Sequence, residues 1–316
     1  LLLAAQVLRT DNEALEAARS LAANAREHAG KRDLQRKLPW SLVEEFTRSG
    51  LGSLSIAREF GGPQVSFVTL AEVFAIISAA DPALGQIPQN QVGILSLIAA
   101  TATPAQKEHL FASVLQGWRI GNAGPERGSK NTLDIKARII ADGDDFAING
   151  QKFYSTGALF AHWIAVKAVN DEGRQVMAFV RRGTPGLRVV DDWSGFGQRT
   201  TASGTVLLNN VRVEAEQVVD SSRLNDAPNI QGAVSQLIQA AIDLGIARGA
   251  IADTLSFVRE RSRPWIDAKV ERNSDDPYVI ADIGKLHIEL HAAEALLRKA
   301  GRVLDEVSAA AIDAPG

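Results

Sequence analysis

Three short segments of the chain contain residue types that could bind a ligand. The first, residues 121–129, combines three glycines with Asn122, Ala123 and Ser129. Glycine lets a ligand approach the backbone closely, and free N–H groups there can hydrogen-bond a planar heterocycle. The same composition is also typical of an ordinary interdomain loop joining helices to a β domain.

The second segment, residues 152–158, contains Tyr154, Ser155 and Thr156 at the end of a predicted strand. An aromatic ring and two hydroxyls at such a place could stack on a planar ring and hydrogen-bond it. A plain strand with a buried tyrosine would explain the same residues. The preceding dipeptide Asn149-Gly150 predicts a hairpin turn.

The third segment, residues 259–265, has three arginines near the end of a predicted helix, closed by Pro264. Guanidinium groups such as that of Arg263 can bind a phosphate through two hydrogen bonds. Cations at a helix C-terminus also complement the helix dipole without a ligand, so both interpretations stay open. Trp193 could line an apolar pocket, although a buried tryptophan is more often part of the core.

We predict no metal site. The chain has no cysteine, which excludes disulfides, thiolate catalysis and cysteine-ligated metals. His287 and His291 have the four-residue spacing of a metal pair, but both flank an apolar helical stripe, so histidines at the edge of a bundle are the simpler interpretation. No phosphate-binding glycine loop, dinucleotide fingerprint or nucleophile elbow is present.

The elements that must position these residues fall into three zones. Residues 1–118 show helical spacing of apolar side chains, clearest at residues 67–80, where Asp81-Pro82 ends the pattern. Residues 119–224 read as a β domain. Its predicted strands are residues 133–139, 163–169, 176–180, 187–190 and 205–213, with a turn at Asp142-Gly143.

Helical spacing returns over residues 225–316. Apolar residues from Ile283 to Val307 step by three and four, as in a bundle helix that needs partners. We therefore expect a C-terminal helical bundle that is incomplete here, its C-terminal part missing.

Length and composition fit an ordinary globular protein. The chain has 316 residues and a formal net charge of -3, enough for two or three domains and without the basic footprint of a nucleic-acid-binding protein. No apolar run reaches the ~18 residues of a membrane span. The short apolar N-terminus is followed at once by charged residues, unlike a signal peptide. We expect a cytoplasmic protein that binds neither nucleic acid nor membrane.

The order of these zones and motifs resembles the acyl-CoA dehydrogenase family across essentially the whole chain. In that family an N-terminal helical domain, a middle β-barrel or sandwich domain and a C-terminal helical bundle enclose a flavin, so the resemblance implies an α+β multidomain fold. The family's Thr-Glu-Pro-Gly-x-Gly-Ser-Asp loop is matched at Pro125, Gly128 and Ser129 and departed from at Ala123, Gly124 and Lys130. Its aromatic and hydroxyl segment is matched by Gly150, Lys152, Tyr154 and Thr156.

The departures resemble one branch of the family, the FMN-dependent dibenzothiophene monooxygenases and related sulfur-acquisition flavoproteins. The segments that carry this resemblance are Gly121-Asn122-Ala123, Asp192-Trp193, Arg263-Pro264-Trp265 and Asp276-Pro277-Tyr278. The branch implies FMN rather than FAD. The implied cofactor-binding residues are Asn122, Ala123, Ser129, Tyr154, Ser155, Thr156 and Arg263.

The same resemblance implies roles for several residues. Asn122 and Thr156 would be catalytic, near the reactive edge of the flavin, and Arg263 would contact the phosphate across a subunit interface. The substrate side would be lined by Asn90, Gln91 and Trp193. The assembly would be a homodimer or homotetramer.

The implied reaction is that of a two-component enzyme. A separate NADH-dependent flavin reductase would supply reduced FMN, and O₂ would form a C4a-hydroperoxyflavin that oxidises a small organosulfur substrate. One alternative is a FAD-dependent acyl-CoA dehydrogenase, which the missing Thr-Glu pair disfavours. The other is a non-catalytic helical interaction protein of the same fold, which the intact flavin segments disfavour.

Overall fold

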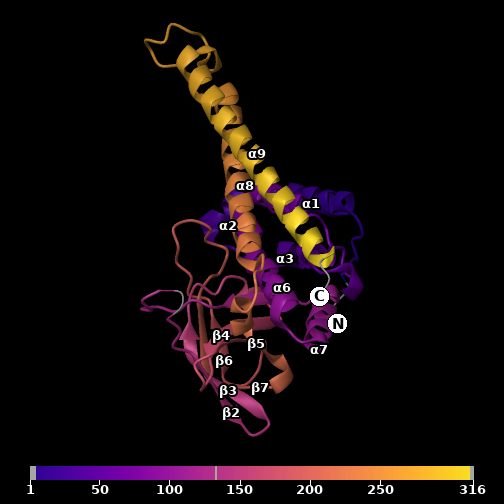
Figure 1. Cartoon of the computed structure of the whole chain (residues 1–316). Helices are drawn as coiled ribbons and strands as arrows, with labels where there is room; N and C mark the ends of the chain where they lie inside the picture. Colours follow the sequence, from indigo (N-terminus) through magenta and orange to yellow (C-terminus); the bar gives the residue numbers. More distant parts are fainter. Residues whose placement is uncertain (1–4, 132–133, 314–316) are drawn as a thin grey trace.

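The computed structural model describes residues 5–131 and 134–313. A cluster of helices, a β domain and a long pair of antiparallel helices follow one another along the chain (Figure 1). The helices before the β domain are α1 (Asp11–Arg26), α2 (Ala29–Gln35), α3 (Trp40–Arg48), α4 (Phe67–Ala80), α5 (Pro82–Gln86), α6 (Gln89–Thr101) and α7 (Pro104–Leu115).

Side-chain caps set where several of these helices begin. The Ser66 hydroxyl accepts from the N–H of Thr69 at the start of α4, and Asp81 accepts from two N–H groups at the start of α5. Thr103 and Gln106 form a reciprocal capping box on α7. The predicted helix at residues 67–80 is therefore confirmed with both of its ends.

One mixed sheet makes up the β domain. Its strands are β1 (Ile120–Ala123), β2 (Arg138–Asp142), β3 (Asp145–Lys152), β4 (Trp163–Val169), β5 (Gln175–Arg181), β6 (Leu187–Val190), β7 (Thr205–Val213) and β8 (Val218–Val219). The order is β6-β7-β3-β2-β4-β5-β8, and β1 pairs in parallel with β4. The segment 121–129, for which an ordinary interdomain loop was one of two interpretations, thus begins inside a strand.

The hairpin turn predicted at Asn149-Gly150 is wrong, because both residues lie inside β3. The register of β3 against β7 shifts there, between Ile148 and Gly150. The Asn149 side chain accepts from the N–H of Asn210 at 2.8 Å. A Cβ at position 150 would lie 2.6 Å from the Cβ of Ala137. Glycine therefore serves close strand packing here. The other predicted turn, at Asp142-Gly143, is found one residue later, at Gly143-Asp144 between β2 and β3.

The strand predicted over residues 133–139 begins later, at Arg138; residue 133 lies outside the described residues. The reason is a side chain that takes the place of a neighbouring strand. The carboxylate of Glu126 accepts from the N–H groups of Lys136 at 2.8 Å and Ala137 at 2.9 Å. Ile135 and Ala137 are still buried. The alternation of apolar and polar residues therefore predicted which side chains are buried, but not where the strand begins.

After the sheet the chain forms α8 (Gln231–Glu260) and α9 (Pro277–Asp313), which lie side by side and reach far from the β domain (Figure 1). The first half of α8 packs on α4, and Gly245 permits this closeness because a Cβ there would lie 2.4 Å from the carbonyl oxygen of Ala75. Arg248 joins three helices by binding Glu72 at 2.8 Å and Glu294 at 2.6 Å.

Two apolar cores meet at the sheet. One fills the interior of the β domain. The other lies between α6, α7 and the opposite face of β1, β4 and β5, where Ile98 and Phe111 pack with Trp163 and Phe179. This second core fixes β1 against α6. Within the described ranges, no helix is both long enough and apolar enough to cross a membrane.

Candidate functional site

Asn122 and Thr156 lie next to each other at the end of β1. The N–H of Asn122 donates to the carbonyl of Thr156 at 3.1 Å, and the Asn122 amide nitrogen reaches the carbonyl of Tyr154 at 3.5 Å. Gly121 allows this contact, since a Cβ there would lie 2.5 Å from the Cα of Ala158. The structure therefore brings together the two residues predicted to be catalytic.

An aromatic cluster stands beside this pair. Tyr154 has a left-handed backbone (φ 52°) and a ring that is 55% exposed. Its ring centroid lies 4.6 Å from that of Phe153 and 5.6 Å from that of Trp193. Trp193 is held by its indole N–H, which donates to the carbonyl of Gln198 at 3.1 Å. An exposed ring kept in a rare conformation is available to stack on a planar ligand.

Buried hydroxyls continue inward from Thr156. Its Oγ1 lies 2.7 Å from the Oγ of Ser203, which lies 2.8 Å from the Oγ1 of Thr201. The Thr201 hydroxyl donates to the carbonyl of Gln198 at 3.1 Å. Sequence reasoning did not assign Ser203 and Thr201 to the site, and the signal that could have found them is the group of hydroxyl residues Thr200, Thr201 and Ser203 before a strand. The hydroxyl of Ser155 is buried without a hydrogen-bond partner.

A buried ion pair holds the 124–129 loop on β3. The Lys152 ammonium binds the Glu126 carboxylate at 2.6 Å and the carbonyl of Gly124 at 3.1 Å. Burial opposes the charged form of Glu126, but hydrogen bonds from Lys152 and from two backbone N–H groups outweigh it, so the pKa of Glu126 lies below its ordinary value. Burial lowers the pKa of Lys152, and the nearby carboxylate opposes that shift. Ser129 lies on the same loop, where its hydroxyl donates to the Glu126 carbonyl at 3.2 Å.

Asn90 and Asn122 line one cavity of about 330 Å³ where α6, β1, β5 and the start of α8 meet. The other lining residues are Gln89, Gly93, Ile94, Leu97, Met177, Gln231, Ser235, Gln236 and Gln239. Its polar lining consists of amides and one hydroxyl, and no charged side chain takes part. The structure thus joins a residue predicted for the substrate side with one predicted for the flavin side.

Gln91 is placed differently from its neighbour Asn90. It is 3% exposed, and its amide nitrogen donates to the carbonyl of Gly52 at 2.7 Å while its amide oxygen accepts from the N–H of Ile120 at 2.8 Å. Both ends of the amide are therefore engaged by backbone groups. Gln91 was predicted to line the substrate side, but it does not line the cavity that Asn90 and Asn122 share.

Arg263 lies apart from all of these residues. It is exposed in the segment joining α8 to α9, at the end of the helical pair farthest from the β domain (Figure 1). Within one chain it does not meet the 121–129 or 152–158 segments. The predicted contact across a subunit interface stays a prediction, as do the roles of the other site residues toward a ligand.

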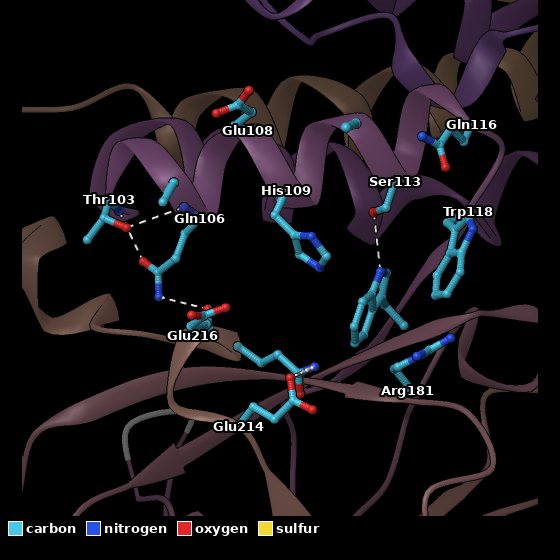
Figure 2. Close-up of a pocket in the computed structure, with 14 residues that line it drawn as sticks. Thr103, Gln106, Glu108, His109, Ser113, Gln116, Trp118, Arg181, Glu214 and Glu216 are labelled. Carbon is cyan, nitrogen blue, oxygen red and sulfur yellow. Dashed lines mark hydrogen bonds between the residues drawn. The ribbon is translucent and has the colours of Figure 1, made fainter. Parts of the chain in front are cut away.

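A second, larger cavity of about 620 Å³ lies between α7 and the sheet, lined by none of the predicted residues. Figure 2 shows Gln106 and His109 of α7, and Thr103 that caps this helix, on one side of it and Glu214 and Glu216 on the other. Many of its polar groups are already engaged. Gln106 donates to the Glu216 carbonyl at 3.1 Å, Trp163 donates to Ser113 at 3.2 Å, and the Arg181 guanidinium lies 5.2 Å from the ring centroid of Trp118.

Over residues 5–131 and 134–313, no three histidine, aspartate or glutamate side chains gather as metal ligands would. His287 and His291 stand with ring centroids 6.0 Å apart. His162, behind the site, accepts from the N–H of Arg119 at 3.0 Å. Burial and the nearby Arg119 charge lower its pKa from 6.5 to about 4, so this imidazole is neutral near pH 7.

Three family models match the chain in order. They are "Acyl-CoA dehydrogenase, N-terminal domain" over residues 10–118, the middle domain over 121–211 and the C-terminal domain over 237–315. The dibenzothiophene monooxygenase of Rhodococcus erythropolis is 31% identical over 94% of this chain and 74% of its own length. A probable FMNH2-dependent monooxygenase of Pseudomonas putida is 28% identical over 92% of this chain and 74% of its own.

Solved structures agree with the sequence relatives. FMN-bound TdsC from Paenibacillus sp. A11-2 superposes with a TM-score of 0.85 at 32% identity, over 91% of this chain and 75% of that one. The chain belongs to the acyl-CoA dehydrogenase family. Within that family its similarity places it among the flavin-dependent monooxygenases. The fold and the family predicted from the sequence are confirmed; the domain boundaries at 118/119 and 224/225 stay a prediction.

Proposed function

We propose that this chain is the oxygenase of a two-component system that uses reduced FMN and O₂ to oxidise a small organosulfur compound. A separate NADH-dependent flavin reductase supplies the reduced FMN, and a homodimer or homotetramer completes the site. The relatives whose names include dibenzothiophene or FMNH2 support this choice of cofactor and substrate class.

The observation that carries the proposal is the cavity shared by Asn90 and Asn122. Asn122 links this cavity to Thr156, because its N–H donates to the Thr156 carbonyl at 3.1 Å. A reacting ligand on the Thr156 side and a substrate on the Asn90 side would meet at Asn122. Because no charged side chain lines the cavity, it favours an uncharged substrate over a carboxylate or a nucleotide.

The residues around Thr156 fit a flavin ring. The exposed Tyr154 ring and the half-buried Trp193 offer aromatic faces, and the buried Ser155 hydroxyl still needs a partner. Neutral donors and acceptors beside aromatic surface suit a planar heterocycle whose edge alternates between carbonyl and nitrogen atoms. The negative phosphate of FMN would be held by Arg263 of a neighbouring subunit.

The chain's own part in the reaction is binding, orientation and the exclusion of water. When bound, reduced FMN supplies the electrons that activate O₂. Asn122 and Thr156 hold the reacting edge with uncharged hydrogen-bonding groups, and one well-placed donor of this kind lowers a barrier by about 2.7–4 kcal/mol. The apolar side chains of Ile94, Leu97 and Met177 form the non-polar part of the cavity wall.

The test is a titration of the protein with FMN and, separately, FAD, followed by turnover with isotope-labelled O₂ and a neutral sulfide or sulfone. We expect tighter binding of FMN and transfer of labelled oxygen to the sulfur compound. Asn122→Ala should lower turnover by about 10²–10³-fold, whereas Asn209→Ala, on the exposed part of β7, should not.

Preferential binding of FAD together with reduction by an acyl-CoA would contradict the proposal and favour the dehydrogenase alternative. A protein that binds neither flavin would favour the non-catalytic alternative.

A further inference from the structure

The buried hydroxyls of Thr156, Ser203 and Thr201 form a chain that ends on the Gln198 carbonyl, here called the hydroxyl chain. Its three links measure 2.7, 2.8 and 3.1 Å. The side chains come from residues that are 8%, 4% and 1% exposed. Water therefore has little access, and each hydroxyl must satisfy its hydrogen bonds within the chain or with a ligand.

The far end of the hydroxyl chain fixes its direction. A carbonyl oxygen can only accept a hydrogen bond, so the Thr201 hydroxyl must donate its single proton to the Gln198 carbonyl. The bond between Ser203 and Thr201 must then use the proton of Ser203. The bond between Thr156 and Ser203 must in turn use the proton of Thr156. Counting protons from the carbonyl outward thus leaves Thr156 with no proton for a ligand and with a free lone pair.

We propose that Thr156 acts toward the flavin as a hydrogen-bond acceptor, and that Ser203 and Thr201 are positioning residues that enforce this. The reactive edge of a flavin carries an N–H in the reduced form and a bare nitrogen in the oxidised form. An acceptor at Thr156 therefore stabilises reduced FMN and repels the oxidised form. This inference rests on the proposed function, because it concerns how the same site selects the redox state delivered by a reductase.

The Gln198 carbonyl also accepts the indole N–H of Trp193 at 3.1 Å. One backbone oxygen thus anchors both the hydroxyl chain and the tryptophan that stands against Tyr154. The loop that carries Gln198 and Thr201 positions the aromatic surface and the polarity of Thr156 together. A change in this loop would alter both features at once.

The test compares the dissociation constants of oxidised and reduced FMN for the full chain, the second under anaerobic conditions. In the wild-type protein we expect reduced FMN to bind more tightly. Ser203→Ala removes the acceptor that holds the Thr156 proton, so the preference should fall about tenfold, the equivalent of 1.4 kcal/mol. Ser221→Ala is the matched control, because it also deletes a buried serine hydroxyl but lies outside the hydroxyl chain.

A second variant gives a sharper outcome. In Thr201→Val the Ser203 hydroxyl loses its acceptor and can donate only to Thr156, which then turns its own proton toward the ligand. The preference for reduced FMN should fall at least as far as in Ser203→Ala, although Thr201 is one link farther from the flavin. Thermal melting confirms that each variant is folded.

An unchanged preference in both folded variants would overturn the inference while leaving the proposed function intact. Absence of FMN binding in the wild-type protein would instead remove the proposed function itself.

Discussion

The region around Thr156 and the groove between α8 and α9 are built on opposite principles. Around Thr156, polar side chains are buried and bonded to one another, as in the Lys152–Glu126 pair and the hydroxyl chain. Along α8 and α9, an apolar groove of about 1010 Å³ is left open between the helices. Leu296, which lines it, is 69% exposed.

The difference shows what each region requires. Buried polar bonds have preferred directions, so they fix the positions of a few atoms, which a site for a reacting ligand needs. Apolar packing has no preferred direction and stabilises in proportion to the area covered. The site region is therefore sensitive to the loss of single partners, whereas the helical pair depends on what covers its groove.

The largest effect is expected at the buried ion pair. Lys152→Met leaves the Glu126 carboxylate without its cation. The side chains of Lys152 and Glu126 are only 0% and 5% exposed, so water cannot replace the lost partner. We expect the free energy of unfolding to fall by about 3–5 kcal/mol, measured by urea denaturation. Adding Glu126→Gln removes the uncompensated charge and should restore part of the loss. A loss below about 1 kcal/mol in Lys152→Met would show that this region does not depend on the pair.

A matched pair of truncations compares covered and uncovered parts of the helical pair. Ile238 in α8 is fully buried in an apolar core that includes Leu70, Phe74 and Ile77 of α4, and Leu296 in α9 is mostly exposed. Ile238→Ala should cost about 2–5 kcal/mol of unfolding free energy, and Leu296→Ala less than about 0.5 kcal/mol. A comparable loss in both variants would mean that the groove is covered in solution, and its dependence on protein concentration would identify self-association.

The smallest effect concerns pH. Burial and the charge of Arg119 lower the pKa of His162 from 6.5 to about 4. Between these values the unfolded chain takes up a proton that the folded chain refuses, so stability is present above pH 6.5 and is lost as the pH falls toward 4.

His162→Asn keeps an acceptor for the Arg119 N–H but cannot titrate. Its melting temperature should fall less steeply than that of the wild-type protein between pH 7 and 5. The matched control is His28→Asn, because the His28 side chain is 65% exposed, and it should retain the wild-type slope. Equal slopes in His162→Asn and wild type would remove His162 as a source of the acid sensitivity.

Local patterns in the sequence predicted much of the fold. The strands at β4, β6 and β7 and the helix α4 match their predicted ranges, because turns, caps and proline mark their ends within a few residues. Asn149-Gly150 was misread for the same reason: its local preference for a turn is overridden by pairing with β2 on one side and β7 on the other.

The site was predicted less completely, since its decisive contacts join distant residues. Asn122 and Thr156 were predicted as a pair through the family resemblance, and the structure places them in contact. Ser203 lies 47 residues from Thr156 along the chain, and Lys152 lies 26 residues from Glu126. No spacing rule connects such residues, because their proximity is created by the pairing of β3 with β7 and by the fold of the 124–129 loop.

The amide of Gln91 has a mechanical consequence for the cavity in front of Asn122. Its amide donates to the carbonyl of Gly52 and accepts from the N–H of Ile120. Gln91 therefore connects α6 both to the segment at residue 52 and to β1. The wall that carries Asn90 is therefore stationary relative to the strand that carries Asn122. The opposite wall, at the start of α8, meets α6 through the Gln231 amide, which donates to the Gly93 carbonyl at 3.3 Å, and through the buried side chains of Val234, Leu237 and Ile238. The walls of the cavity formed by α6, β1 and the start of α8 are therefore held in place before a substrate arrives, so its shape selects the ligands that it can accept.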